Sequence, residues 1–343
     1  MGTTEAASQD ERKPGGLPGR LLTVMQFNIW LGGSEVEGGR AGVADTVADT
    51  RPDVVTLSET NQERVADLLA DLRERGLTYF GDGNRMDPAV ISRHRIIERR
   101  SFPFWSKAVV SVGGIGIAVY SGHLEYRYYV TYLPRGYGGG VPKPLETYKY
   151  EWKEIPSGPI TDTALITRLN AASGRTAVTR IVLADAAVER AKGRLTLLAG
   201  DFNEPSHRDW DKRTRHLFDH HGTEITWSTT KAIEAAGFRD SYREINPDPV
   251  LTPGFTWPSD NPGADVDQLT WAKKADERDR IDFVFYHPDE RIELLDSILV
   301  GPAGSIVRSK RVPESGNDRF RHPTWTWPTD HKVVLSTFHL TES

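Results

Sequence analysis

The sequence predicts one large domain that mixes α-helices and β-strands, and three observations indicate this. Short apolar segments typical of buried strands recur along the chain. Segments with a helical spacing of apolar residues lie between them. No linker-like segment follows residue 20, although 343 residues would suffice for two ordinary domains. We therefore expect residues 21–340 to form a single domain.

Residues 1–20 are polar and rich in Gly, Pro and charged side chains, so we expect a disordered leader. They contain no apolar run, so no signal peptide is predicted, and a secreted and a cytoplasmic location both stay open. No run of about 18 apolar residues occurs in the sequence, so we expect no membrane-spanning helix.

The first elements read as strand, helix, strand and helix. Residues 21–29 are apolar and β-prone, and residues 40–50 have apolar residues at helical spacing. Residues 53–57 form a second buried strand. The clearest helix spans residues 60–76, where Thr60 and Glu63 form a predicted capping box.

The later elements follow the same reasoning. A helix is expected over residues 163–190, with a break near Gly174. Further strands are expected at residues 89–92, 108–112, 115–123, 194–199, 281–286 and 332–340.

An aromatic-rich insert at about residues 126–160 interrupts this pattern. Residues 126–155 hold seven of the eleven tyrosines. Neither a strand period nor a helix period survives there, so we expect a long ordered loop on the surface. Arg127, Arg135 and Tyr137 are candidates to bind substrate, because aromatic faces and cations suit a base, a sugar or a lipid headgroup. A loop held only by its own aromatic residues is the alternative.

The composition narrows the function classes. The absence of cysteine excludes disulfides, thiolate zinc sites, iron–sulfur clusters and cysteine nucleophiles. A formal net charge of −5 argues against a protein that binds nucleic acid by bulk charge. A nuclease with a metal ion and a local basic patch stays open, and the oligomeric state is not indicated.

Polar residues gather at the ends of the predicted strands, where the active-site loops of α/β folds lie. A single residue of this kind is usually a turn former or a helix cap, but a whole group is harder to explain in that way. The group consists of Asn28, Glu59, His123, Asp201, Asn203, Asp282, Asp330 and His331.

The residue types in this group fit hydrolysis of a phosphoester. Carboxylate and amide oxygens suit a hard divalent ion such as Mg²⁺ or Mn²⁺. Two histidines and a further carboxylate can transfer protons and contact the phosphate. The sequence lacks the HExxH motif of zinc proteases, the GxxxxGK[ST] motif of NTPases and the GxSxG motif of α/β-hydrolases.

Five motifs, in order along the chain, resemble those of the endonuclease/exonuclease/phosphatase superfamily. The resemblance covers about residues 21–340, and GDFN and the closing TDH are its most specific parts. It implies an α+β fold, a four-layer αββα sandwich of two packed mixed β-sheets flanked by helices, with the site at one edge. The motifs are Phe27-Asn28-Ile29-Trp30, Ser58-Glu59-Thr60, Gly200-Asp201-Phe202-Asn203, Arg280-Ile281-Asp282-Phe283 and Thr329-Asp330-His331.

The resemblance also implies roles for the oxygen-bearing residues of these motifs. Asn28, Glu59 and Asp330 would hold or surround the metal ion. Asp201 would orient or deprotonate the attacking water. Asn203 would bind the phosphate and steady Asp201.

The two histidines have implied roles as well. His331 would contact the phosphate, with Asp282 bracing its other ring nitrogen, which favours the charged imidazolium. His123 would stabilise the phosphate oxygens or assist the leaving group. Two departures from the family pattern are Thr329, where many members have Ser, and Gly122, which replaces a Thr and is expected to make the backbone more pliant.

Other residues are candidates for the walls of the substrate pocket. His207 and Trp210 follow GDFN closely enough to line it, whereas His220 and His221 look like surface residues. Residues 307–327 carry five basic side chains that suit a phosphate, with a solvated charged loop as the equal alternative.

The sequence supports three functions, in order of preference. The first is a metal-dependent phosphodiesterase or phosphatase that acts on a small, sugar-linked or lipid-linked phosphoester by in-line attack of an activated water. The second is a metal-dependent nuclease on DNA or RNA. The third is a non-catalytic binding module on the same scaffold. Net acidity and the aromatic insert favour the first function over the second.

Overall fold

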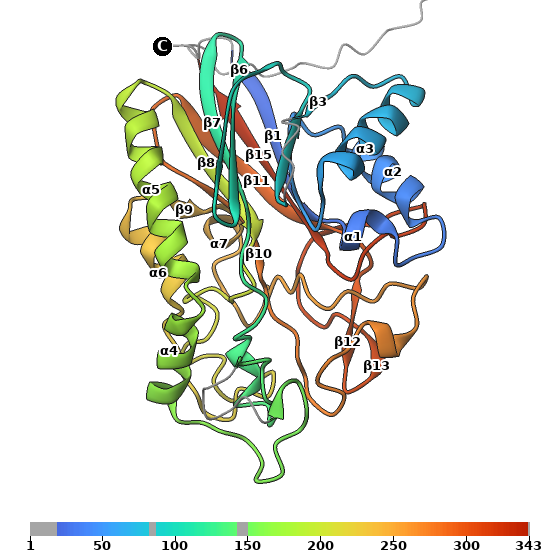
Figure 1. Cartoon of the computed structure of the whole chain (residues 1–343), viewed down its shortest axis with the longest axis vertical. Coiled ribbons are helices and arrows are strands. Elements are labelled where there is room, and N and C mark those ends of the chain that lie inside the picture. Colours follow the sequence, from blue (N-terminus) through green and yellow to red (C-terminus); the bar gives the residue numbers. More distant parts are fainter. Residues whose placement is uncertain (1–18, 82–86, 143–149, 342–343) are drawn as a thin grey trace, which may run out of the picture.

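The computed structural model describes residues 19–81, 87–142 and 150–341, and its strands form two stacked β-sheets flanked by helices (Figure 1). All but the last two residues of the predicted disordered leader lie outside the described residues. No described helix has the length and apolar content needed to cross a membrane.

The first sheet has seven strands in the order β14-β11-β15-β1-β2-β4-β3. Its central strand β1 pairs parallel with β2 and antiparallel with β15, so the sheet is mixed. The strands are β1 (Arg20–Asn28), β2 (Val54–Ser58), β3 (Phe80–Gly81), β4 (Ala89–Ser92), β11 (Ile292–Val300), β14 (Phe320–Arg321) and β15 (Val333–Leu340).

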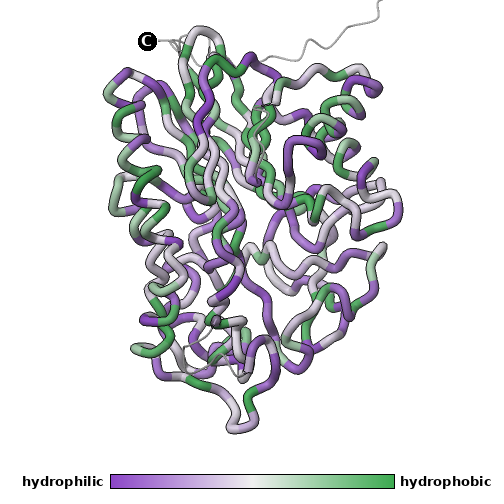
Figure 2. The backbone as a smooth tube through the Cα atoms, viewed as in Figure 1, coloured by the Kyte–Doolittle hydropathy of each residue, from purple (hydrophilic) through white to green (hydrophobic). Residues whose placement is uncertain are grey.

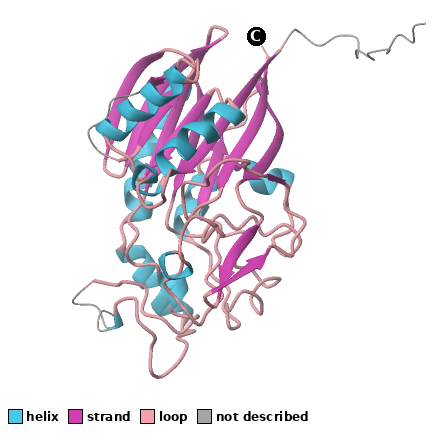
Figure 3. Ribbon diagram, turned by 90° about the vertical axis from the view of Figure 1, so that its right-hand side faces the viewer, coloured by secondary structure: helices cyan, strands magenta, loops and turns pink. Residues whose placement is uncertain are grey.

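The second sheet has six strands in the order β5-β6-β7-β8-β10-β9. The pair β7–β8 is parallel and its neighbours are antiparallel. The strands are β5 (Ile96–Phe102), β6 (Trp105–Val112), β7 (Ile115–His123), β8 (Leu195–Asp201), β9 (Arg239–Asp240) and β10 (Asp282–Tyr286). A separate hairpin of β12 (Gly304–Val307) and β13 (Lys310–Pro313) lies below the sheets (Figure 3).

Helices cover the outer face of each sheet. Apolar residues of α2 (Gly39–Thr50) and α3 (Gln62–Glu74) pack on the first sheet, and those of α5 (Arg175–Ala191) and α6 (Ser228–Ala235) pack on the second. The remaining helical elements are α1 (Trp30–Gly33), α4 (Thr163–Ala172), α7 (Ser241–Ile245) and the 3₁₀ turns η1 (Val130–Tyr132) and η3 (Val266–Gln268).

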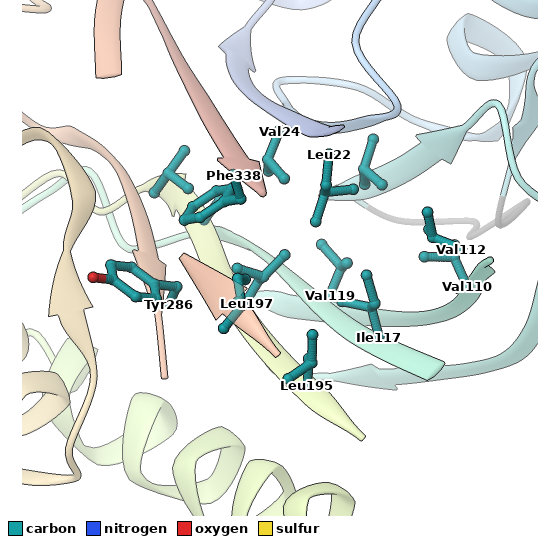
Figure 4. Close-up of a cluster of buried hydrophobic side chains, with 14 of the residues drawn as sticks. Leu22, Val24, Val110, Val112, Ile117, Val119, Leu195, Leu197, Tyr286 and Phe338 are labelled. Carbon is teal, nitrogen blue, oxygen red and sulfur yellow. The ribbon is translucent and has the colours of Figure 1, made fainter. Parts of the chain in front are cut away.

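The main core lies between the two sheets and follows from strand alternation. On β1, Leu22 and Val24 face the second sheet, while Met25 and Phe27 pack against α2 and α3. Figure 4 shows Leu22 and Val24 among side chains of β6, β7 and β8. Hydrophobic segments accordingly run along the strands and helices (Figure 2). The predicted four-layer α+β sandwich is confirmed.

The predicted elements are found with small differences. The helix over residues 163–190 is broken as expected, because Gly174 adopts φ 78° between α4 and α5. The predicted capping box of α3 is wrong: the cap is Asn61, whose side chain accepts a hydrogen bond from the backbone N–H of Arg64 at 2.9 Å.

The aromatic insert differs from its prediction as a surface loop. Its described residues form a folded segment in which Tyr129, Tyr132 and Tyr137 are buried. The Tyr137 hydroxyl accepts a hydrogen bond from the backbone N–H of Lys274, which ties the insert to a distant loop. Burial of aromatic side chains therefore fixes the insert in place, although its sequence shows neither a strand period nor a helix period.

Candidate active site

Strand register brings the polar strand ends to one edge of the molecule. Asn28 at the end of β1 pairs with Ser58 at the end of the parallel strand β2. In the second sheet, His123 at the end of β7 pairs with Asp201 at the end of β8, and Asp201 faces Asp282 at the start of β10. Both sheets therefore present their polar termini at the same edge.

Asn28 joins the two sheets at this edge. Its side-chain Nδ2 donates to Glu59 Oε1 at 3.1 Å and to Asp201 Oδ2 at 2.9 Å, and it lies 3.3 Å from His331 Nε2. Its Oδ1 accepts from the backbone N–H of Trp30 at 3.0 Å. One buried amide thus contacts groups from both halves of the sandwich.

His331 forms a buried pair with Asp282. The His331 Nδ1 lies 2.9 Å from Asp282 Oδ2, and Gln26 donates to the other oxygen of Asp282 at 3.2 Å. Burial lowers the pKa of His331, but the carboxylates of Asp282 and Asp330 outweigh it and raise the pKa to about 10. The imidazolium form is therefore favoured, and Nε2 faces the site.

His123 forms a second pair that the sequence did not reveal. Its Nδ1 contacts the carboxylate of Asp87, and Asp87 Oδ1 accepts from the backbone N–H of Thr60 at 3.2 Å. Burial lowers the pKa of His123, but Asp87 raises it to about 9. Asp87 lies in a turn-rich stretch that no strand pattern marks, so only the fold places it beside His123.

Asp201 lies between the two histidines. Its Oδ2 is 3.9 Å from His123 Nε2 and 3.8 Å from His331 Nε2. The backbone N–H of Asn203 donates to Oδ1 at 2.9 Å, so the main chain steadies this carboxylate. The Asn203 side chain donates instead to the carbonyl of Leu124 at 3.0 Å.

The site concentrates negative charge away from water. Burial and the Asp282 carboxylate raise the pKa of Asp201, and burial and Asp330 raise the pKa of Glu59. Asp201, Asp282 and His331 each present one donor atom within 4.8 Å of the others. The Glu59 and Asp330 carboxylates, which repel one another, offer the oxygen donors that a hard divalent cation prefers, so these residues fit a metal ion.

Two glycines allow β7 and β8 to bring His123 and Asp201 together. A Cβ on Gly200 would lie 2.2 Å from the carbonyl oxygen of Gly122, and a Cβ on Gly122 would lie 2.8 Å from the Trp105 ring. Gly122 therefore leaves room for the Trp105 ring, which would have to shift if this residue carried a side chain.

These polar strand ends open into a pocket of about 630 Å³. Glu59, His123, Asp201, Asp330 and His331 form its floor. Aromatic side chains cover much of its wall. They are Trp30, Tyr126, Tyr129, Tyr132, Trp152, Trp257 and Trp271.

Trp257 connects this wall to the floor. Its Nε1 donates to Asp330 Oδ2 at 3.0 Å, and the backbone N–H of Ser259 donates to the Asp330 carbonyl. These bonds orient the Asp330 carboxylate toward the pocket. Sequence reasoning did not find Trp257, because residues 246–280 hold only a short 3₁₀ turn and no strand that would mark its place.

The predicted substrate-binding residues of the insert lie outside the pocket. Arg135 is buried and pairs with Asp279 at 2.6 Å, so its prediction as a pocket residue is wrong. Arg127 pairs with Glu125 at 2.6 Å, and Tyr137 is buried in the insert. Tyr126, which was not predicted to bind substrate, lines the pocket, whereas these three side chains do not.

The residues after GDFN also differ from expectation. His207 bonds to Thr230 and Glu234 at 2.9 Å and does not line the pocket. Trp210 is buried, and His220, expected at the surface, is buried against it with ring centroids 3.6 Å apart. Both rings are part of the core beneath the insert.

The basic loop over residues 307–327 forms ion pairs rather than a phosphate site. Arg308 pairs with Asp219, and Arg321 pairs with Asp49 at 2.8 Å. Arg311 and Arg319 contact Asp260 and Asp296. Residues 307–327 therefore match the alternative prediction, a charged and partly solvated loop.

Two His–carboxylate pairs around buried acidic oxygens, at the shared edge of a two-sheet sandwich, define a hydrolase that works with a metal ion. The chain belongs to the Endonuclease/Exonuclease/phosphatase family, whose model matches residues 25–331. It is therefore a metal-dependent phosphoester hydrolase, and the predicted family is confirmed.

Other proteins resemble the chain over most of its length. An uncharacterised protein of Caenorhabditis elegans, F14F9.5, is 28% identical over 322 residues, which cover 92% of this chain and 91% of that protein. A Bacteroides thetaiotaomicron family member of known structure is 16% identical, with a TM-score of 0.50 and coverage of 95% of this chain and 100% of that one. D. rerio TDP2, solved with a single-strand DNA product, is 16% identical with a TM-score of 0.49 over 93% and 98% of the two chains.

Proposed function

We propose that this enzyme is a phosphodiesterase or phosphatase that acts, with Mg²⁺ or Mn²⁺, on a compact, sugar-linked or lipid-linked phosphoester. The composition of the pocket carries this proposal. Arg64 is the one lysine or arginine among the described residues that line it. A nucleic acid strand needs a basic track along its phosphates, whereas a single phosphoester needs only the floor groups.

Asn28, Glu59 and Asp330 are the residues proposed to hold or surround the cation. Glu59 follows β2 and Asp330 precedes β15, and the carboxylates of both line the pocket. Asn28 acts beside them, because its oxygen accepts from Trp30 and its Nδ2 donates to Glu59 Oε1. A divalent cation bound there neutralises negative charge that develops on the phosphoryl oxygens.

Asp201 is the proposed base. Its carboxylate accepts a proton from water as the water oxygen forms a bond to phosphorus and the bond to the leaving alcohol oxygen breaks. The N–H groups of His123 and His331 donate to the phosphoryl oxygens, and an imidazolium can return a proton to the leaving oxygen. Asp87 and Asp282 hold these rings in place through the opposite nitrogen.

A panel of phosphoesters tests this function. The purified protein is assayed with bis-p-nitrophenyl phosphate, p-nitrophenyl phosphate, sphingomyelin, inositol phosphates and plasmid DNA, each with Mg²⁺, Mn²⁺ or EDTA. We expect turnover of a small substrate that EDTA abolishes and one of the two ions restores. Efficient cleavage of DNA alone, with a steep fall as salt rises, would instead identify a nuclease.

A further inference from the structure

A continuous row of aromatic rings leads from the catalytic floor to the pocket mouth. Trp257 begins it beside Asp330, and Trp271 ends it, with 49% of its surface exposed. Trp152 and Trp271 have ring centroids 4.9 Å apart. We call this row the aromatic wall; its members are Tyr126, Tyr129, Tyr132, Trp152, Trp257 and Trp271.

Most neighbouring rings of the aromatic wall meet at steep angles. The interplanar angle is 84° between Tyr129 and Tyr132, 82° between Tyr132 and Trp152, and 56° between Trp152 and Trp271. Rings at such angles surround a rounded group from several sides, as in the aromatic cages that bind quaternary ammonium ions. Tyr126 and Trp152 instead lie nearly parallel, with an interplanar angle of 10°.

The tyrosine hydroxyls of the wall bond to carboxylates. The Tyr129 hydroxyl donates to Asp279 at 3.0 Å, and the Tyr132 hydroxyl donates to Glu277 at 2.5 Å. A phenol that donates to a carboxylate gains electron density in its ring, which strengthens the attraction of the ring face for a cation.

Glu277 places negative charge behind the wall. Its side chain is 1% exposed and accepts hydrogen bonds from the Thr270 and Tyr132 hydroxyls and from the backbone N–H groups of Trp271 and Ala272. Burial raises the pKa of Glu277, and these four donors oppose that rise; two of them are backbone N–H groups, which bond only to an acceptor oxygen. No described Lys, Arg or His nitrogen lies within ion-pair distance of it.

We propose that the aromatic wall binds an organic ammonium group, of the trimethylammonium class, carried by the phosphoester. The inference rests on the proposed function and names the substrate class of that same site. The electron-rich rings, the charge of Glu277 and the exposed Glu35 on the pocket lining all favour a cation. The floor takes the phosphate of the same molecule.

A matched pair of substrates tests the inference. The first is the p-nitrophenyl phosphodiester of choline, and the second is its neutral isostere, in which a tert-butyl group replaces the trimethylammonium group. Because the two have the same shape, a difference in kcat/KM reports the charge. We expect roughly a 10-fold preference for the choline diester, the scale of a cation held by aromatic faces. Equal values would overturn the inference.

Variants locate the preference. Trp271→Leu and Glu277→Gln should each reduce the choline preference several-fold, measured within each variant as the ratio of kcat/KM for the choline diester to kcat/KM for its isostere. Trp325→Leu is the matched control, because Trp325 bonds to Thr46 and does not line the pocket. A folded Trp271→Leu variant that keeps the full preference would contradict the assignment.

Binding separates this inference from the proposed function. If neither diester is hydrolysed, the proposed function fails, and quenching of tryptophan fluorescence by choline then decides the inference. Choline should quench the wild type at lower concentration than its tert-butyl isostere, and less in Trp271→Leu. Equal quenching by the two probes would overturn the inference without any assay of activity.

Two natural sources of the group are distinguished in a last arm. Glycerophosphocholine is a soluble diester, and phosphatidylcholine vesicles present the same headgroup at a lipid surface. Turnover of the first alone identifies a soluble substrate, and turnover of the second identifies a lipid. Either result supports an ammonium-bearing phosphoester.

Discussion

Asp201 is the residue at which the contributions of both sheets meet. Asn28 donates to its Oδ2 at 2.9 Å. The Nε2 atoms of His123 and His331, each from its own His–carboxylate pair, lie within 4 Å of the same oxygen. A carboxylate in this position can accept a proton only while it is ionised, and the two neighbouring imidazolium groups favour that form.

Replacement of this carboxylate should abolish most turnover. Asp201→Asn keeps the shape but removes the base, so we expect kcat to fall by about 10²–10⁴-fold. His331→Ala should fall in the same range, because it removes an N–H from the phosphate. The thermal midpoint and circular dichroism of each variant check the fold. Asp267→Asn, at a side chain that is 76% exposed, is the control; near-normal turnover in Asp201→Asn would contradict the site.

The pH profile should report Asp87. Because Asp87 raises the pKa of His123 to about 9, the imidazolium persists below that pH, and activity falls as pH rises through it. In Asp87→Asn the smaller effects of Asp201 and Glu59 remain but the largest opposition to burial is lost, so the alkaline limb should move down by about one pH unit or more. Asp53→Asn, which alters the pair of Asp53 with His94, serves as control. An unchanged limb would exclude His123 as the titrating group.

Among single residues, the polar residues at strand ends could be predicted from the sequence, whereas residues paired across long sequence distances could not. Asn28, Asp201 and their partners follow apolar strands, and register alone then brings them together. Arg135 was misjudged, since its partner Asp279 lies 144 residues away and no local pattern reveals a buried ion pair. Asp87 was missed for the same reason.

At the scale of elements, α5 is fixed to the second sheet by a buried ionic cluster. Lys107 on β6 lies 2.9 Å from both Asp185 and Glu189 on α5. Arg194 also contacts Glu189. The cluster lies between the second sheet and α5, whose apolar residues pack on the outer face of that sheet.

Acid should therefore loosen α5. Lys107 and the basic neighbours outweigh the effect of burial and lower the pKa of Glu189 to about 2, below its ordinary value near 4.5. The stabilisation is present above pH 4.5 and is lost as pH falls toward 2. Glu189→Gln should lower the free energy of unfolding by about 2 kcal/mol at pH 7 and less at pH 3. Urea unfolding at both pH values measures this, with exposed Glu224→Gln as control; the same loss at both would contradict it.

The strands of the two sheets that sequence reasoning missed all lack a clean apolar run. β5 carries charged residues at exposed positions, and β11 alternates irregularly, so neither shows a clean apolar run. β3, β9 and β14 are two residues long, too short for any periodicity. Only pairing with neighbouring strands defines them.

At the scale of the whole molecule, the site spans the interface between the sheets. Glu59 follows β2 and Asp330 precedes β15 of the first sheet, whereas Asp201 in β8 and Asp282 in β10 belong to the second. Asp330 repels Glu59, and Asp282 repels Asp201, so the acidic charge on each side of this edge opposes folding. A cation that binds there stabilises the entire sandwich.

Added Mg²⁺ or Mn²⁺ should raise the thermal midpoint. A cation at about 100 times its Kd contributes about 2.7 kcal/mol to the folded state. In EDTA, Glu59→Gln should have a higher thermal midpoint than the wild type, because the raised pKa of Glu59 means that its ionised form is unfavourable in the fold. When metal is added, the midpoint of this variant should rise less than that of the wild type. Exposed Glu37→Gln is the control. A midpoint insensitive to both ions would contradict the metal site.

The aromatic wall is built from the segments around residues 126–152 and 257–271, and none of its residues lies in a strand of either sheet. The catalytic groups sit at strand ends that the core holds fixed. Recognition and reactivity are therefore separable in evolution. Substitutions in the wall at residues other than Trp257, which bonds to Asp330, can change what the enzyme selects while the reaction stays the same, so a new ligand preference can arise without rebuilding the hydrolytic machinery.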